Sequence, residues 1–283
     1  MKKVLTLIIL FFASLNAYSN EIALVLSGGG ARAVAQVGVI EVLEEHGIRP
    51  NVIVGTSGGA IIGVMYADNP DATNLRQIAS TLHQDNLVDV SYIRGLGSLL
   101  GFKTSMVDLT KGREYISGNM KAQKFHELDI PFISVVTDLD TGETIGIRDG
   151  HIAEAIIASC SVPGIFSHVE IDGKRYVDGG VTAPAGVEIA KDLNAKHIIV
   201  VDTILPAKLR EASNSWDLFH RSHSLRFRKL NEYIVRDASV VIKPHIEDVG
   251  LFDYHRSEEL IEIGRQAARK MIPEIRKQLS LVK

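Results

Sequence analysis

Five short runs rich in isoleucine and valine recur along the chain, and longer stretches of helical character lie between them. The runs are continuous rather than alternating with polar residues, which is typical of strands covered on both faces of a sheet. Strands that alternate with helices pair in parallel and leave helices on both sides. We therefore expect an α/β fold, a three-layer α/β/α domain with a mostly parallel central sheet. The predicted strands cover residues 22–26, 52–54, 132–136, 198–201 and 240–242.

The first helical stretch, residues 31–46, is largely apolar, with Gln36 and three glutamates among its few polar residues. Glu41, Glu44 and Glu45 recur at helical spacing and so fall on one face. Gly47 then offers a stop for the helix. The pattern predicts a mostly buried helix with a single acidic face.

The first nineteen residues have the layout of a secretory signal peptide. Two lysines precede an apolar run, residues 4–15, and Ala17 and Ser19 occupy the −3 and −1 positions of a cut before Asn20. The run is shorter than the ~20 residues that span a bilayer as a helix. An uncleaved N-terminus or a core strand is the alternative. The signal peptide predicts an exported protein, periplasmic or secreted, with membrane association left open.

No internal repeat or low-complexity linker interrupts residues 20–283, which we interpret as a single domain. Hydrophobic residues make up 46% and charged residues 23%, as in ordinary globular proteins. The net charge of −3 gives no reason to expect a nucleic-acid partner. Cys160 is the one cysteine of the chain, so an intramolecular disulfide is excluded. We expect it to be buried as a small hydrophobe.

The strongest chemical signal is the pentapeptide Gly-Thr-Ser-Gly-Gly at residues 55–59. It follows the second predicted strand and opens an apolar helical stretch, which is the context of a nucleophile elbow. The strained turn projects the serine hydroxyl from the sheet, and side chains at the flanking glycines would clash with backbone. The helix that follows directs free N–H groups at the developing oxyanion. Ser57 is therefore the predicted nucleophile, with Gly55, Gly58 and Gly59 in support. The alternative is a glycine-rich turn whose serine only caps the helix.

A second turn, Ser-Gly-Gly-Gly-Ala-Arg at residues 27–32, follows the first predicted strand. Three consecutive glycines leave their N–H groups unshielded, as an anion-binding cradle requires. A dinucleotide site would need an acidic residue at the end of the second strand, where this chain has Ser57 instead. The first two strand-to-helix turns of a parallel sheet open at one edge. The glycine amides can therefore face Ser57 as an oxyanion hole.

Residue spacing leaves the base that activates Ser57 open. Ten histidines are available, but none follows a clear strand in a tight turn. The other candidate is Asp178, which a short strand, residues 174–177, delivers into the turn Asp-Gly-Gly. Most Asp-Gly pairs are Asx turns, so spacing does not decide between a turn and a base.

The three motifs together, Ser27–Arg32, Gly55–Gly59 and Asp178–Gly180, resemble those of the patatin-like phospholipases. The connecting segments 137–142 and 158–166 are similar to the bacterial branch of that family. The similarity extends over nearly all of residues 20–283.

This resemblance implies lipid acyl hydrolysis by a Ser57–Asp178 dyad without histidine. It implies an oxyanion hole from Gly28, Gly29 and Gly30, with Arg32 and Gly179 as supporting motif residues. It also implies a lipid or membrane-surface acyl ester as substrate, and no metal or cofactor. Asp138, Asp140 and Gly142 superficially suggest a calcium loop, but the remaining ligands of such a loop are missing, so we interpret them as turn residues.

Several positions depart from the usual family pattern. Ala33 stands where glycine is usual, Gln36 where histidine is usual, and Gly58 where alanine is common. Ala183 and His168 replace a frequent asparagine and proline. A methyl group at Ala33 lies beside the tight loop, and one misaligned oxyanion donor costs ~3 kcal/mol. The alternative function is therefore a catalytically weak or silent patatin-fold protein that binds a lipid or a partner.

Two further segments suggest contact with lipid. Residues 92–106 combine apolar side chains with glycines, as in a mobile flap or, equally, a buried loop. The basic residues Arg221, Arg226, Arg228 and Lys229 fit either anionic head groups or, more simply, a solvated helix face. The mature chain contains no apolar run that predicts a transmembrane span.

Overall fold

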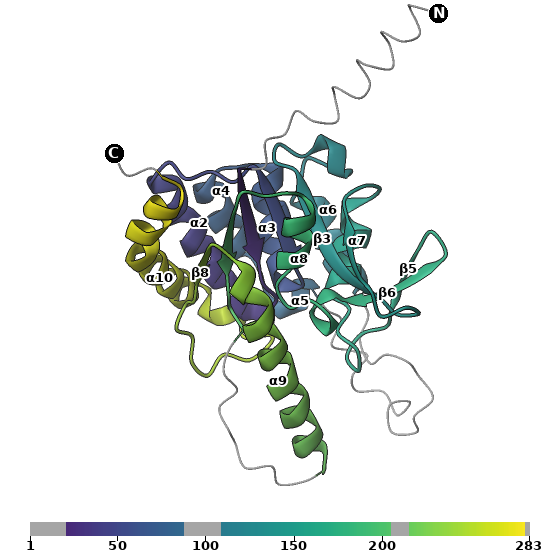
Figure 1. Ribbon diagram of the computed structural model, residues 1–283. Helices are drawn as coiled ribbons and strands as arrows, with labels where there is room; N and C mark the ends of the chain where they lie inside the picture. The colour runs from purple at the N-terminus through teal and green to yellow at the C-terminus, as the bar shows by residue number, and fades with distance from the viewer. Residues whose placement is uncertain (1–20, 88–108, 205–214, 281–283) are drawn as a thin grey trace, which may run out of the picture.

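The computed structural model describes residues 21–87, 109–204 and 215–280 (Figure 1). The predicted signal peptide, residues 1–19, and the predicted flap, residues 92–106, lie outside the described residues. Within those ranges, no helix combines the length and the apolarity that crossing a bilayer requires.

An eight-stranded sheet forms the centre of the molecule, with the order β5-β6-β3-β2-β1-β7-β8 and with β4 paired to β3. The five predicted strands are confirmed, and they pair in parallel as β3-β2-β1-β7-β8. They are β1 (Ile22–Leu26), β2 (Val52–Thr56), β3 (Phe132–Asp138), β7 (His197–Val201) and β8 (Val240–Ile242). The antiparallel strands are β4 (Thr144–Ile147), β5 (Val169–Ile171) and β6 (Lys174–Asp178).

Helices cover both faces of the sheet, as the continuous apolar runs predicted (Figure 1). In β1, Leu24 and Leu26 belong to one hydrophobic cluster, whereas Ala23 and Val25 belong to another on the opposite face. Successive side chains of a strand point to opposite faces, so each cluster is one inter-layer core. The three-layer α/β/α fold is therefore confirmed.

The larger cluster takes side chains from α2 (Ala35–Glu45), α3 (Gly58–Asp68), α4 (Ala72–Ser80), α6 (Thr110–Gly118), α7 (Ile152–Ser159) and α10 (Ser257–Gln278). The smaller cluster takes them from α8 (Val187–Asp192), the end of α9 (Ser215–Ile234) and η6 (Val235–Asp237). The remaining short elements are α5 (Gln84–Leu87), η1 (Gly30–Val34), η4 (Phe125–Glu127), η5 (Gly179–Val181) and η7 (Tyr254–Arg256).

The closest helix contact joins α2 to α10. A Cβ atom at Gly38 would lie 1.9 Å from the Ile261 carbonyl oxygen, and one at Gly264 would lie 1.8 Å from the Ala35 carbonyl oxygen. Only glycine at both positions allows the two backbones to approach this closely. Because α2 follows the glycine loop directly, this contact fixes the helix that carries the loop.

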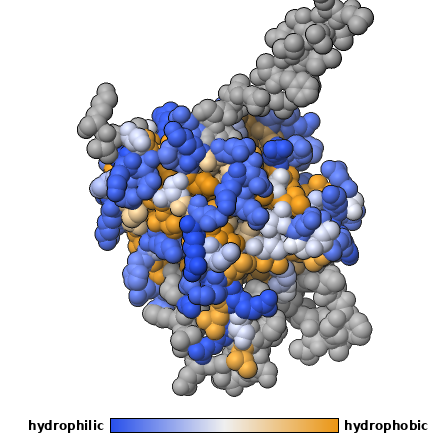
Figure 2. Space-filling view, viewed as in Figure 1, coloured by the Kyte–Doolittle hydropathy of each residue, from blue (hydrophilic) through white to orange (hydrophobic). Residues whose placement is uncertain are grey.

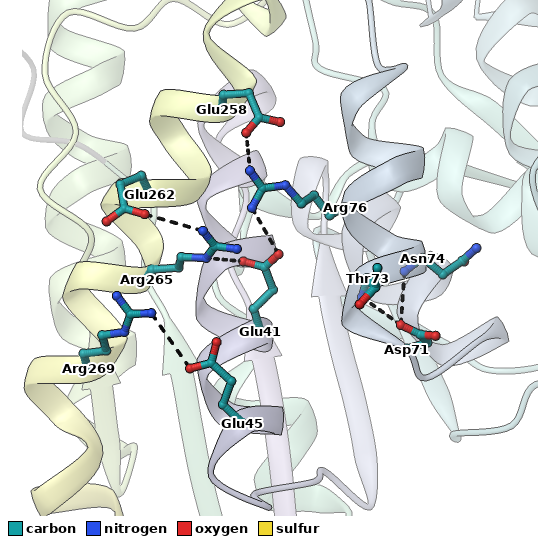
Figure 3. Close-up of polar contacts among 10 residues, drawn as sticks. All are labelled: Glu41, Glu45, Asp71, Thr73, Asn74, Arg76, Glu258, Glu262, Arg265 and Arg269. Atoms are coloured by element: carbon teal, nitrogen blue, oxygen red, sulfur yellow. Dashed lines mark hydrogen bonds and ion pairs between the residues drawn. The ribbon is translucent and has the colours of Figure 1, made fainter.

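The acidic face of α2 meets arginines at the same contact (Figure 3). Glu41 accepts hydrogen bonds from Arg265 Nε at 2.5 Å and from Arg76 Nη1 at 3.4 Å. Arg76, from α4, also pairs with Glu258 of α10, and Arg269 lies 3.9 Å from Glu45. The predicted acidic face is therefore confirmed as an ionic contact that joins three helices.

Candidate active site

Ser57 lies at the turn between β2 and α3 with φ 53° and ψ −125°, a backbone conformation that is strained for a serine. The close packing around the turn explains both flanking glycines. A Cβ at Gly59 would lie 2.4 Å from the Leu26 carbonyl oxygen, and one at Gly55 would lie 2.6 Å from Ala60 Cα. The predicted strand–turn–helix context of the elbow is confirmed.

Asp178 ends β6, which pairs antiparallel with β3; this register sets Asp178 opposite Val136, one residue beyond the Val135 that pairs with Thr56. Its carboxylate is 5% exposed, and Oδ1 accepts a hydrogen bond of 2.6 Å from the Gly180 N–H. Gly179 is required because a Cβ there would lie 2.3 Å from the Val135 carbonyl oxygen. The Asp-Gly turn is thus both an Asx-type turn and a means of burying the carboxylate.

The Ser57 hydroxyl lies close to the Asp178 carboxylate. Burial raises the pKa of Asp178 to about 6, and the nearby Ser57 hydroxyl and the Gly180 N–H oppose that rise. The second oxygen, Oδ2, is buried without a hydrogen bond of normal geometry. The fold therefore brings together the two residues proposed as a dyad and leaves one carboxylate oxygen able to take a proton.

The glycine loop lies against the elbow because β1 and β2 are adjacent, with Leu26 paired to Gly55. A Cβ at Gly28 would lie 3.3 Å from Ser57 Cβ. The Gly28 N–H, however, donates to the Pro184 carbonyl at 2.9 Å, so it is not available to an oxyanion. This corrects the prediction for Gly28.

The N–H groups of Gly29, Gly30 and Gly58 donate to no acceptor in the described part of the chain. Gly30 has φ 58°, and a Cβ there would lie 2.5 Å from Leu251. Gly58 opens α3, where the first N–H groups of a helix are unpaired and the helix dipole is positive. We therefore assign the candidate oxyanion donors to Gly29, Gly30 and Gly58.

Arg32 supports this loop from within η1. Its Nε donates to the Gly29 carbonyl at 3.0 Å, and its backbone N–H donates to the same oxygen at 3.3 Å. Burial lowers the pKa of Arg32. The guanidinium thus holds the peptide that presents the Gly30 N–H.

Gln36 and Thr203 hold the loop from the opposite side. Gln36 Nε2 donates to the Ser27 carbonyl at 2.8 Å, and Thr203 Oγ1 donates to the Gly28 carbonyl at 3.0 Å. The Thr203 N–H donates to Ser27 Oγ at 2.9 Å. Gln36, which departs from the family pattern, is therefore a structural support of the cradle. No sequence pattern pointed to Thr203, which lies just after β7.

Ser159 is a second functional residue that sequence reasoning missed. Its Oγ accepts a hydrogen bond from the Ser57 N–H at 2.8 Å and donates to the Val135 carbonyl at 2.6 Å. Ser159 thus links the Ser57 backbone to β3 and holds the strained turn in place. Ser159 lies in the segment 158–166 that resembles the family, which was the one available clue.

Ala33 and Gly58, which both depart from the usual family pattern, lie next to each other in the fold. A Cβ at Gly58 would lie 2.9 Å from the Ala33 Cβ and 2.7 Å from the Gly30 carbonyl oxygen. The Gly30 carbonyl and the Ala33 methyl group therefore together occupy the space that an alanine at position 58 would need. The two departures from the family pattern thus share one packing contact.

An apolar cavity opens beside Ser57. Gly30, Ser57 and Gly58 form its polar end, and the rest of the wall is almost entirely apolar. The wall comprises Ile61, Leu87, Leu109, Gly112, Ile116, Ile157, Cys160, Val162, Phe166, Leu251, Phe252 and Tyr254. No histidine lines the cavity within the described residues. The arrangement fits a hydrocarbon chain whose reacting end lies at Ser57.

Cys160 lies on this wall close to the Ser57 hydroxyl. Burial and the nearby Asp178 raise the pKa of its thiol well above the ordinary value. It is therefore a small, protonated wall residue, although it is partly exposed rather than fully buried as predicted.

The acidic loop after β3 is a turn, as predicted. Asp138 Oδ1 accepts hydrogen bonds from the N–H groups of Asp140 and Thr141, and Asp140 pairs with Arg175. Within the described residues, no cluster of side chains has the composition of a metal site.

Comparison with known proteins gives a consistent picture. Residues 24–191 match the family model of the patatin-like phospholipases. The chain is 29% identical over 275 residues to patatin-like phospholipase domain-containing protein 7 of Rattus norvegicus. It is 30% identical over 275 residues to patatin-like phospholipase domain-containing protein 6 of Mus musculus. Each alignment covers 87% of this chain but only 20% of the relative, so the chain spans about a fifth of the length of these relatives.

Among solved structures, VipD from Legionella pneumophila has a similar fold, with a TM-score of 0.52 at 12% sequence identity. The superposition covers 90% of this chain and 67% of VipD.

Proposed function

Because this chain belongs to the patatin-like phospholipase family, we propose that it is a lipid acyl hydrolase of the phospholipase A type, a carboxylic-ester hydrolase. Ser57 is the nucleophile, and Asp178 is its acid–base partner. The N–H groups of Gly29, Gly30 and Gly58 form the oxyanion hole.

One observation carries this proposal. A serine in a strained elbow lies beside a buried carboxylate whose pKa is raised to about 6, at the mouth of an apolar cavity. An ordinary carboxylate is too weak a base to activate a hydroxyl well, and burial without a cation makes it a stronger one. A helix-capping serine needs neither the base nor the cavity.

In the first step, Asp178 accepts the hydroxyl proton as Ser57 Oγ attacks the ester carbonyl. Oδ2 is the oxygen that receives the proton, because Oδ1 is held by the Gly180 N–H. Charge develops on the carbonyl oxygen, and the free glycine amides stabilise it. Protonated Asp178 then donates the proton to the leaving alcohol, and an acyl-serine remains.

In the second step, Asp178 takes a proton from water as the water attacks the acyl-serine. The tetrahedral intermediate collapses, the proton returns to Ser57 Oγ, and the fatty acid is released. The acyl chain occupies the apolar cavity in both steps, which excludes bulk water from the ester and strengthens the oxyanion contacts.

A fluorophosphonate probe tests the proposal. Labelling of the wild type but not of Ser57→Ala supports a serine hydrolase. If the folded wild-type protein is not labelled and releases no fatty acid from phospholipid vesicles, the proposal is wrong. The protein is then the catalytically silent lipid- or partner-binding alternative. A lipid screen with Ser57→Ala as control then identifies the substrate.

A further inference from the structure

Helix α9 projects past the edge of the sheet at which the parallel strands end, the edge that carries Ser57 and Asp178 (Figure 1). Its C-terminal half is attached to the body. A Cβ at Gly180 would lie 2.8 Å from the Phe227 ring, and Asn231 Nδ2 donates to Asp202 Oδ1 at 2.9 Å. The N-terminal half extends beyond the body.

The outward face of α9 carries Leu218, Ser222, Arg226, Lys229 and Tyr233, all exposed. At 3.6 residues per turn these positions lie within about 80° of one another, and Phe227 and Asn231 lie on the opposite side. Leu218 is 58% exposed and Tyr233 is 71% exposed. One surface of the helix thus combines a large apolar residue, two cations and an aromatic ring.

Two further exposed apolar side chains lie on the body of the molecule. Leu139 follows the end of β3 and is 45% exposed, and Val181 follows Gly180 and is 43% exposed. Together with Leu218 and Tyr233 they are the exposed large hydrophobic residues of the described ranges. Figure 2 shows hydrophobic surface along the lower rim of the body beside α9. We refer to Leu218, Arg226, Lys229 and Tyr233, on the outward face of the helix, as the α9 edge surface.

The charge of α9 opposes that of the whole chain. The helix contains four arginine or lysine residues and two acidic residues, whereas the chain carries a net charge of −3. Arg228 and Lys229 both lie near Glu232, but the exposed Arg226 has no recorded partner within the described residues. Cations interspersed with exposed apolar residues are typical of helices that lie in the interface of an anionic bilayer.

We propose that the α9 edge surface docks on an anionic phospholipid bilayer. This inference rests on the proposed function, since it names the surface that brings the protein to the membrane that contains its substrate. Leu218 enters the region between head groups and acyl chains, and Arg226 pairs with lipid phosphate.

Vesicle sedimentation of the full chain tests the proposal. All proteins carry Ser57→Ala, so that turnover does not alter the vesicles, and any contribution of residues 1–20 is common to all of them. The variant is Leu218→Ser combined with Arg226→Glu. The matched control is Lys270→Glu on the distal half of α10, an exposed cation away from this edge.

We expect binding to phosphatidylcholine vesicles containing phosphatidylglycerol to exceed binding to pure phosphatidylcholine. The α9 double variant should bind the anionic vesicles at least about tenfold more weakly, and Lys270→Glu should match its parent. Equal binding by the double variant and its parent would overturn the proposal. Absence of a preference for anionic vesicles would overturn it as well and would point to a protein partner for α9.

The same substitutions in the active background separate this proposal from the proposed function. Hydrolysis of a soluble short-chain ester should stay within twofold in the α9 double variant, whereas hydrolysis of vesicle lipid should fall with binding. If the wild type does not hydrolyse the soluble ester, the proposed function is refuted. The vesicle-binding result would still test the docking proposal.

Discussion

Glu41, in the contact between α2 and α10, and Asp178, beside Ser57, are both carboxylates with little exposure, at 8% and 5%. Their surroundings differ. Glu41 is hydrogen-bonded by Arg265 and Arg76, whose positive charges offset the cost of its burial (Figure 3). Among the residues that the structure describes, Asp178 has no cation beside it, and its partners are one backbone N–H and one hydroxyl.

The contrast shows how one chemical group serves two purposes in one fold. A buried carboxylate with cationic partners joins helices, because breaking the pair would leave a charge uncompensated. A buried carboxylate without them is a stronger base, because burial disfavours its charged form. The presence or absence of an arginine, rather than burial itself, separates the structural carboxylate Glu41 from Asp178, the proposed base.

The largest expected effect is on turnover. Asp178→Asn should lower kcat on a soluble ester by about 10³-fold or more, because no other base lies beside Ser57 in the described parts of the chain. Glu41→Gln, the matched control in a buried carboxylate, should keep kcat within about threefold. Steady-state kinetics of the two folded variants measures the difference. A mild loss in Asp178→Asn together with a severe loss in one histidine variant would indicate a histidine-dependent esterase.

The same substitution should stabilise the fold. The pKa of Asp178 is raised to about 6 in the folded state, above the ordinary value near 4. The folded state therefore becomes less stable as pH rises from about 4 to 6, and the full penalty of about 2–3 kcal/mol persists above that range. Asp178→Asn removes this penalty. Urea unfolding should show that Asp178→Asn has a larger free energy of unfolding than the wild type at pH 7.5. At pH 4 this difference should disappear.

Glu41→Gln should change stability in the opposite direction. Removing the charge leaves Arg265 and Arg76 without their shared partner, at a cost of about 1–2 kcal/mol because both arginines are partly exposed to solvent. Urea unfolding of Glu41→Gln and of Lys270→Glu, an exposed control on α10, gives the comparison. Equal midpoints for the two variants would contradict an ionic role for Glu41.

The last prediction concerns the pH dependence of kcat/KM, in which Glu41→Gln should differ least from the wild type. Asp178 acts as a base only when deprotonated, so kcat/KM should rise with pH through an apparent pKa of about 6. Below that value, activity should fall about tenfold for each pH unit. Replacing Glu41 by Gln should leave this midpoint in place. A midpoint shared by both carboxylate variants and the wild type would assign the titration to another group.

The sequence was sufficient for the features that are local in the chain. The continuous apolar runs predicted the five parallel strands, and the glycines around Ser57 predicted the elbow, because both patterns depend on neighbouring residues. The Ser57–Asp178 pairing required the family resemblance, since an Asp-Gly turn is commonplace and the antiparallel return of β6 is not encoded in spacing.

Contacts between distant segments could not be predicted in this way. The Gly28 N–H was assigned to the oxyanion hole because nothing near it in the chain reveals Pro184 as its acceptor. The support from Ser159 and Thr203 likewise comes from residues 102 and 176 positions away from their partners. A single serine or threonine forms no recognisable sequence pattern, so its hydrogen-bond partners can be identified only from the folded structure.

The close packing around Gly58 has a consequence for which changes this loop can accept. An alanine at position 58 would place its methyl group 2.7 Å from the Gly30 carbonyl oxygen and 2.9 Å from the Ala33 Cβ. Changing Ala33 to glycine would remove only the second of these contacts, so the backbone of the glycine loop would still have to shift. The two positions are therefore coupled through the loop backbone, although 25 residues separate them in sequence.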